Sequence, residues 1–423
     1  MDTWGLAVAA ALVLGYSVVS RRLDRTVLTA PLVFVLGGLA VGDDGLGLID
    51  LRIGSEAVRL LAEVTLTLVL FADASRIDLR TLRRELGFPA RLLAIGLPLT
   101  ILAGAGAAVG LLGELLLVEA VVLAIVLAPT DAALGQAVVT DPRLPSRIRQ
   151  GLNVESGLND GLCVPLLFIA LALAEADVGA LSAHDAVHLV LEEIGFGVVG
   201  GLVAGALGAL ALRVALRHAL VSDEWIQVVP IASAGLAYGI AAPLGGSGFI
   251  AAFVGGLAFG ALRGAEEHRT FVADVTGLVL SALTFVVFGA AILGPALGVV
   301  GWESVVYAVL SLTVVRMLPV AVALVGTGAR LPTVSYSGWF GPRGLASIVF
   351  AVIVLDEADL PHSETIIATI VLTVALSVVA HGITARPLTD AYVRWYESHP
   401  KPPPMESTPT PEQRWRWPHR AER

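Results

Sequence analysis

Residues 115–139 read LLLVEAVVLAIVLAPTDAALGQAVV, and this stretch contains both features that decide the fold. It is long and apolar enough to cross the ~30 Å hydrocarbon core of a bilayer, which needs roughly 20 residues of helix. Pro129 interrupts it, because proline lacks a backbone N–H and obstructs the preceding helical turn. Thr130 and Asp131 follow directly. The sequence therefore predicts a membrane helix that is broken beside a carboxylate, where freed carbonyl oxygens suit a small cation.

The composition extends this prediction to the whole chain. It has 423 residues, of which 56% are hydrophobic and 15% charged, and a mean hydropathy of +0.83. A soluble domain is about 45–50% apolar and about 25% charged, so an ordinary water-soluble protein is excluded. We expect an all-α polytopic membrane protein with about thirteen transmembrane helices, twelve being the alternative count. The apolar runs are 4–20, 26–42, 58–76, 88–112, 115–139, 147–174, 185–217, 224–243, 247–262, 272–292, 303–326, 333–355 and 363–389.

Basic residues predict the orientation of these spans. Arginines collect in the loops after odd-numbered runs, as at 21–25, 76–84 and 143–149, whereas the opposite loops contain only Arg52 and Arg59. Because basic loops stay in the cytoplasm, we expect the N-terminus outside and the C-terminus inside the cell inner membrane. The first run lacks a basic leader and is expected to be retained.

The tail, the cysteine count and the net charge restrict the classes of function that the chain could have. The Pro-rich tail 391–423 is expected to be short, disordered and cytoplasmic. The single cysteine, Cys163, excludes intramolecular disulfides and cysteine-based metal clusters, and a net charge of −9 argues against a nucleic-acid partner. We expect no cofactor.

Five ionisable residues lie near the centres of apolar runs, where each costs about 2.5–3.5 kcal/mol and so predicts a functional site. They are Asp131, Glu155, Asp160, Arg316 and Arg343. Run 147–174 contains Asn153-Val154-Glu155-Ser156-Gly157-Leu158-Asn159-Asp160. On a helix, Ser156 and Asp160 share one face at i,i+4, and Glu155 and Asn159 share a neighbouring one. A buried arginine needs a carboxylate, and Glu155 is the expected partner of Arg316.

The segment Gly338-Trp339-Phe340-Gly341-Pro342-Arg343-Gly344 predicts a second broken helix. Pro129 and Pro342 lie in the fifth and twelfth runs, and an offset of seven spans places these two helices in opposite orientation. That arrangement is typical of inverted repeats with two discontinuous crossing helices at a substrate site. Asp131 and Arg343 are expected to balance the dipole charges of the half-helix ends.

These motifs resemble the monovalent cation/proton antiporters, most closely the NhaP-type and animal sodium/hydrogen exchangers. The resemblance covers most of 4–389 and rests on Thr130-Asp131, Glu155-Ser156-x-x-Asn159-Asp160, Arg316 and Gly341-Pro342-Arg343-Gly344. It implies that Asp160 binds the cation and the proton, that Asp131, Ser156 and the Thr130 backbone complete the ligand shell, and that Glu155 pairs with Arg316.

The resemblance also implies an organisation and a mode of exchange. A moving core would comprise about 88–174 and 303–389, and a dimer-forming panel about 4–76 and 224–292, within a transmembrane domain of residues 1–390. Asn159 before Asp160 is the version associated with electroneutral exchange. The chain departs from the family at Phe71-Ala72-Asp73-Ala74, where NhaP-type members often have Phe-Glu-Gly-Gly, and Asp73 is a candidate substitute ligand.

The expected function is a secondary transporter, not an enzyme, that exchanges Na⁺ for H⁺ by alternating access in a homodimer. Li⁺ and K⁺ remain open because all three cations take oxygen ligands, and a potassium-selective or electrogenic exchanger is the alternative. A remote alternative is an intramembrane serine protease that uses Ser247, in Gly245-Gly246-Ser247-Gly248, and His381. That hypothesis leaves the buried charges unexplained.

Overall fold

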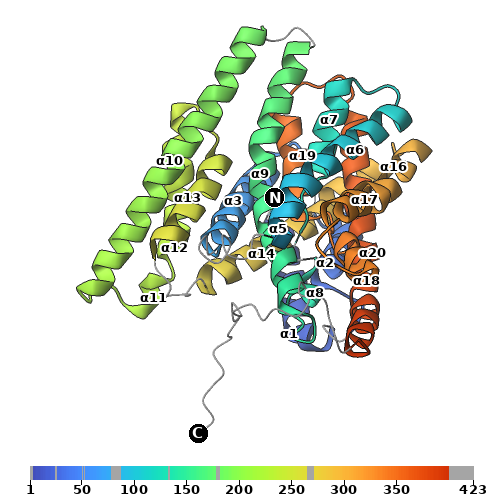
Figure 1. Cartoon of the computed structure of the whole chain (residues 1–423). Coiled ribbons are helices and arrows are strands. Elements are labelled where there is room, and N and C mark those ends of the chain that lie inside the picture. Colours follow the sequence, from blue (N-terminus) through green and yellow to red (C-terminus); the bar gives the residue numbers. More distant parts are fainter. Residues whose placement is uncertain are drawn as a thin grey trace.

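The structure is a computed structural model of the whole chain (Figure 1), and it describes residues 3–23, 26–49, 51, 53–77, 87–131, 134–177, 182–263 and 271–399. Within these ranges every regular element is a helix. The expected all-α fold is therefore confirmed. The expected disordered tail falls mainly on residues 400–423, which lie outside the described residues.

The helices follow the apolar runs. Their bounds are α1 Thr3–Leu23, α2 Ala30–Val41, α3 Glu56–Ser75, α5 Gly87–Arg91, α6 Leu97–Leu111, α7 Leu117–Val126, α8 Gln136–Val139, α9 Ser146–Asp177, α10 Ala183–Arg217, α11 Asp223–Ile226, α12 Val229–Ala241, α13 Gly248–Arg263, α14 Phe271–Val287, α15 Gly294–Leu297, α16 Trp302–Leu312, α17 Val314–Ala323, α18 Leu331–Trp339, α19 Leu345–Glu357 and α20 Ser363–Glu397. Two π-helical segments, η1 (Leu92–Gly96) and η3 (Phe288–Leu293), and a 3₁₀ turn, η2 (Ala242–Leu244), connect some of them.

Among the described residues, eight helical segments are long and apolar enough to cross a membrane, by length and composition. Three shorter apolar helices, α2, α7 and α13, add to them. The protein is thus a multi-pass membrane protein, while the count of thirteen spans stays a prediction. The last helix runs to Glu397, past residue 391, where the sequence predicted the tail to begin.

The two runs expected to be broken at Pro129 and Pro342 are discontinuous, as predicted. Run 115–139 forms α7 and the short α8, and run 333–355 is divided between α18 and α19. We call residues 127–131 the first break and residues 340–344 the second break. The sequence did not predict a third interruption at Thr313, where φ −112° and ψ −93° separate α16 from α17.

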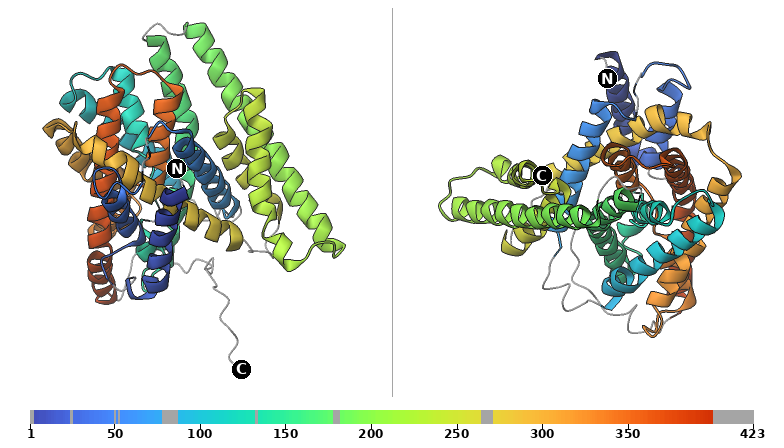
Figure 2. Two further views of the ribbon diagram at one scale, coloured as in Figure 1. Left: turned by 180° about the vertical axis from the view of Figure 1, so that it is seen from behind. Right: turned by 90° about the horizontal axis from the view of Figure 1, so that it is seen from above.

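Two groups of helices pack together, and they contact each other through α9 and between α3 and α19. One group contains α3, α10, α12 and α13, and the other contains α6, α7, α9 and α16 to α20. Figure 2 shows, from above, that α10 and its neighbours project to one side of the second group. The helix α10, which the sequence assigned to neither core nor panel, packs on α12 and α13.

Close helix approach explains part of the glycine content. A Cβ atom on Gly205 of α10 would lie 2.2 Å from the backbone oxygen of Gly255 on α13. Only glycine permits this separation, as in other membrane helix pairs in which small residues let two backbones meet. The opposite face of α10 exposes Leu191, Val199 and Leu207, as expected for a surface in contact with lipid.

Candidate functional site

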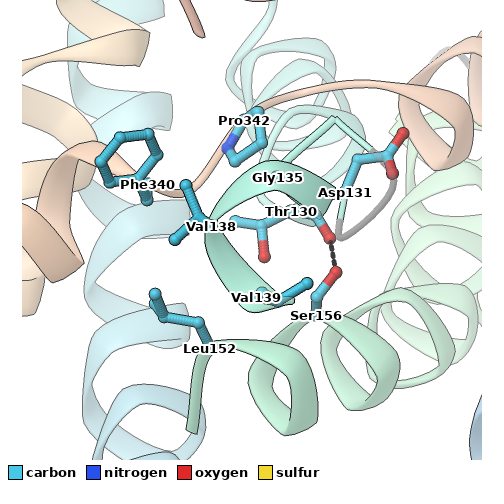
Figure 3. Close-up of a pocket in the computed structure, with 9 residues that line it drawn as sticks. All are labelled: Thr130, Asp131, Gly135, Val138, Val139, Leu152, Ser156, Phe340 and Pro342. Atoms are coloured by element: carbon cyan, nitrogen blue, oxygen red, sulfur yellow. Dashed lines mark hydrogen bonds between the residues drawn. The ribbon is translucent and has the colours of Figure 1, made fainter. Parts of the chain in front are cut away.

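The two breaks cross each other in the middle of the second helix group. The backbone N–H of Asp131 in the first break donates to the backbone oxygen of Pro342 in the second, at 2.8 Å. Figure 3 shows Pro342 beside the segment that contains Thr130 and Asp131. Each proline interrupts its own helix, and the freed backbone groups of one break find partners in the other. The crossing of discontinuous helices that the sequence predicts is therefore present.

Asp131 caps the helix that follows the opposite break. Its Oδ2 accepts a hydrogen bond from the backbone N–H of Leu345 at 2.8 Å, and Leu345 is the first residue of α19. A helix N-terminus carries a partial positive charge, so this carboxylate is electrostatically stabilised. Gly344 permits the contact, because a Cβ there would lie 2.1 Å from Oδ2 of Asp131.

Arg343 makes the complementary contact at the end of α7. Its Nη1 donates to the backbone oxygens of Ala128 at 3.1 Å and Pro129 at 3.3 Å, and the side chain is fully buried. These carbonyls follow the C-terminus of α7, where the helix dipole is negative. Each break thus supplies the charge that compensates a helix end at the other break. Asp131 and Arg343 thus lie at helix ends where they can balance the dipole charges, as expected from the sequence.

The polar face of α9 lies against the first break. Ser156 donates from Oγ to the backbone oxygen of Thr130, and Asn159 donates from Nδ2 to Thr130 Oγ1 at 2.8 Å. Figure 3 shows Ser156 pointing at the Thr130 carbonyl, whereas the carboxylate of Asp131 points away from Ser156. The small pocket here is lined by Thr130, Asp131, Gly135, Val138, Val139, Leu152, Ser156, Phe340 and Pro342. Its oxygens come from Thr130, Asp131 and Ser156, all three expected ligands.

Asp160 lies one turn further along α9 and is 9% exposed. Within the described part of the chain, its buried Oδ1 has no hydrogen-bond partner. Asp131 and Asp73 are the charged groups that interact with it electrostatically. An unpaired buried carboxylate oxygen is costly unless a proton or a cation occupies it. Asp160 is therefore the group best placed for reversible binding.

Glu155 and Arg316 form the ion pair that the sequence predicts. Arg316 Nη1 lies 2.6 Å from Glu155 Oε1, and both side chains are 3% exposed. The pair joins α9 to α17 and occupies the charge of Glu155, so this carboxylate is not available as a cation ligand in this arrangement.

Asp73 is placed beside α9 but is paired. Its Oδ1 lies 3.4 Å from Nη1 of Arg76, and both side chains are about a third exposed, at 32% and 29%. A Cβ on Gly157 of α9 would lie 3.4 Å from the Asp73 Cβ. A role as an additional ligand stays a prediction.

The donor set at the breaks consists of oxygen ligands, which suit a small cation. No group of three or more His, Cys, Asp or Glu suited to a metal ion occurs among the described residues. The groups that converge are hydroxyl, carbonyl and carboxylate oxygens, which are hard ligands.

The proposed protease dyad does not form. Both ring nitrogens of His381 face oxygens of Ser377 and Trp339, at 2.9 Å. The Ser247 hydroxyl instead accepts from the backbone N–H of Ile250 at the start of α13. The serine-protease alternative is therefore wrong.

Sequence reasoning missed several residues that support the breaks. Ser347 Oγ donates to the backbone oxygen of Val126, the last residue of α7, at 2.8 Å. Glu119 lies at the other end of α7, where it caps the helix start through the Leu116 N–H and accepts from the His362 N–H. The only signal for Glu119 is an acid in the first turn of a helix; nothing in the sequence singles out Ser347.

The chain is similar in sequence to cation/proton antiporters of yeast and bacteria. A probable Na⁺/H⁺ antiporter of Schizosaccharomyces pombe is 24% identical over 276 residues, covering 60% of this chain and 35% of that protein. The K⁺/H⁺ antiporter NhaP2 of Shewanella oneidensis is 26% identical over 398 residues, covering 92% of this chain and 66% of that protein. The chain thus spans only about a third of the yeast relative and about two thirds of the bacterial one.

The fold is shared with a solved structure. The sodium proton antiporter MjNhaP1 of Methanocaldococcus jannaschii at pH 8 superposes with a TM-score of 0.72 at 23% identity, covering 89% of this chain and 98% of the other. The sequence model of the family described as "Sodium/hydrogen exchanger, transmembrane" matches residues 8–391. Because that match covers nearly the whole chain, the protein belongs to the sodium/hydrogen exchanger family.

Proposed function

We propose that this protein exchanges a monovalent cation for protons across the membrane, and that Asp160 is the group for which they compete. The observation that carries the proposal is the buried Asp160 carboxylate, whose Oδ1 lacks a hydrogen-bond partner among the described residues. It lies on the face of α9 that packs against the crossed breaks. Broken helices near the bilayer midplane form the substrate sites of many secondary transporters.

Competition at one carboxylate is sufficient for exchange. A bound proton neutralises Asp160 and removes its attraction for a cation, and a bound cation disfavours the proton. Ser156, Thr130 and Asp131 supply further oxygens around the cation. One titrating carboxylate that carries either one Na⁺ or one H⁺ transfers no net charge, and Asn159, already bonded to Thr130, adds none. Exchange is therefore electroneutral in this proposal.

The wider organisation follows from the same proposal. A core of about 88–174 and 303–389 moves against a panel that includes 4–76 and 224–292, which carries the site from one side of the membrane to the other. The two helix groups support this division. Two copies pair through the panel in the cell inner membrane, with the N-terminus outside, which the distribution of arginines favours.

Proton flux in proteoliposomes tests the function. Purified protein is reconstituted with a pH-sensitive dye inside, and gradients of Na⁺, Li⁺ and K⁺ are applied with and without a clamped membrane potential. We expect Na⁺-driven proton flux that is independent of the potential. A response to K⁺ instead would favour the alternative suggested by the name of the Shewanella relative, and no flux with any cation would contradict the proposal.

Asp160→Asn tests the site within the same assay. It keeps the size of the side chain and removes the exchangeable charge, so we expect flux to fall to the level of protein-free liposomes. Asp177→Asn is the matched control, because Asp177 is an exposed acid at the end of the same helix. Sustained cation-driven flux in Asp160→Asn would refute the assignment.

A further inference from the structure

Two side chains on α20 contact both ends of the second break. Ser377 Oγ accepts a hydrogen bond from the backbone N–H of Arg343 at 2.7 Å, at the end of the break. His381, one turn later, places Nε2 2.9 Å from the backbone oxygen of Trp339, just before the break. Both side chains are at most 1% exposed. The segment between Trp339 and Arg343 is therefore held at each side by neighbouring turns of one helix.

His381 has polar partners at both ring nitrogens. Its Nε2 lies 2.9 Å from the backbone oxygen of Trp339, and its Nδ1 lies 2.9 Å from the backbone oxygen and 3.2 Å from Oγ of Ser377. A carbonyl oxygen can only accept, so a ring nitrogen that bonds one of these backbone oxygens is the donor. Ser377 and His381 therefore belong to one connected group of polar contacts that extends from Arg343 to Trp339.

Further contacts fix the ring in this orientation. The imidazole of His381 stacks on the indole of Trp339, with ring centroids 5.0 Å apart and an interplanar angle of 29°. The indole Nε1 of Trp339 donates to Thr384 Oγ1 at 2.9 Å, again on α20. The residue that ends α18 is thus attached to α20 by its backbone oxygen, its ring face and its ring nitrogen.

We propose that Ser377 and His381 are positioning residues for the cation site, acting through the second break. The break lacks regular helical hydrogen bonds, so its conformation depends on external partners. Arg343 and Pro342 in turn contact the first break, through the carbonyls of Ala128 and Pro129 and the N–H of Asp131. Displacement of the second break therefore displaces the oxygens of the site. This inference rests on the proposed function.

The test compares apparent cation affinity with folding. Ser377→Ala removes the acceptor for Arg343 N–H, and His381→Phe removes both ring nitrogens while it keeps a stacking ring. His381→Gln restores an amide donor near the position of Nε2. Thr373→Val is the matched control: Thr373 is a fully buried hydroxyl one turn before Ser377, and within the described part of the chain it bonds its own helix, at Thr369 O.

We expect Ser377→Ala and His381→Phe to raise the KM for Na⁺ in proteoliposomes about threefold to tenfold, as the loss of one hydrogen bond predicts. His381→Gln should recover most of that affinity, and Thr373→Val should keep the wild-type KM. Thermal melts of each variant with and without Na⁺ provide a second readout, in which the Na⁺-induced rise in Tm shrinks for the first two variants only. K⁺ replaces Na⁺ in both assays if the wild type exchanges K⁺.

The outcomes separate this inference from the proposed function. If the wild type drives no proton flux with any cation, the proposed function fails. If the wild type exchanges normally and Ser377→Ala lowers the Tm but leaves both KM and the Na⁺-induced Tm shift unchanged, the two residues are merely structural and the inference is overturned. An equal loss of affinity in Thr373→Val would overturn it as well, because that hydroxyl does not contact the break.

Discussion

For the buried pair of Glu155 and Arg316, we predict that loss of the glutamate destabilises the protein more than loss of the arginine. The two side chains are 2.6 Å apart and 3% exposed, so neither charge is solvated by water when its partner is removed. Arg343 lies close enough to interact electrostatically with both, repelling Arg316 and attracting Glu155. Loss of the glutamate therefore leaves two guanidinium groups that repel each other, whereas loss of Arg316 leaves Glu155 with the attraction of Arg343.

The expected losses in the free energy of unfolding follow from this arrangement of charges. Removing one partner of a buried pair typically costs about 3–5 kcal/mol, and we expect Glu155→Gln to fall in that range. For Arg316→Gln we expect about 1.5–3 kcal/mol, the value of a lost hydrogen bond between charged groups, because Arg343 compensates the remaining charge. The double variant removes the repulsion together with the attraction, so its cost should lie below that of Glu155→Gln alone. It should therefore fall below the sum of the single costs by more than the roughly 1.5–3 kcal/mol expected for Arg316→Gln.

Equilibrium unfolding of the purified protein in detergent, followed by tryptophan fluorescence, measures these differences. The four proteins of the cycle are wild type, the two single variants and the double variant. We expect the double variant to be more stable than Glu155→Gln alone. The reasoning is refuted if Arg316→Gln costs as much as Glu155→Gln, or if the double variant equals the sum of the single ones.

Two further predictions concern the first break and a loop outside the membrane. Gly344→Ala introduces a Cβ 2.1 Å from Asp131 Oδ2, so cation-driven proton flux should fall at least about tenfold. In the control Gly235→Ala the added Cβ meets no atom within 4 Å, and this variant should transport normally. Normal flux in Gly344→Ala would contradict the importance of the Asp131 cap on α19. For Asp141, partial burial raises the pKa, but hydrogen bonds from Arg143 outweigh burial and hold the pKa below its usual value. Its stabilising contribution is thus complete above about pH 4 and is lost as the pH falls through the lowered pKa. Asp141→Asn should lower the Tm at pH 7 with a difference from wild type that shrinks toward pH 3, and a difference that does not change with pH would count against this account.

Much of the helical framework could be predicted, because bilayer thickness imposes a length and an apolar composition on each span. The breaks at Pro129 and Pro342 were predictable for a local reason, the missing proline N–H. Arg316 and Glu155 could be matched because few buried charges of opposite sign were available. The interruption at Thr313 could not be found in this way, because no proline or glycine marks that position.

The support around the breaks was also beyond sequence reasoning. Leu345 N–H bonds a carboxylate 214 residues earlier in the chain, and no local pattern reports such a contact. His381 illustrates the same limit: its sequence neighbours suggested a protease dyad, whereas its partners are Trp339 and Ser377. Serines inside apolar helices give no signal of their own, because they commonly bond the carbonyl one turn earlier.

The exchange of compensating charges between the two breaks has a consequence for biosynthesis. Leu345, whose N–H donates to Asp131, is 214 residues downstream of it, and the same separation lies between Pro129 and Arg343. At about 5–20 residues per second, translation leaves an interval of roughly 10–45 s between the two. During that interval the first break has neither the N–H that bonds Asp131 nor the guanidinium of Arg343, although its spans are already made. The crossing of the two breaks is therefore one of the last features that the growing chain completes.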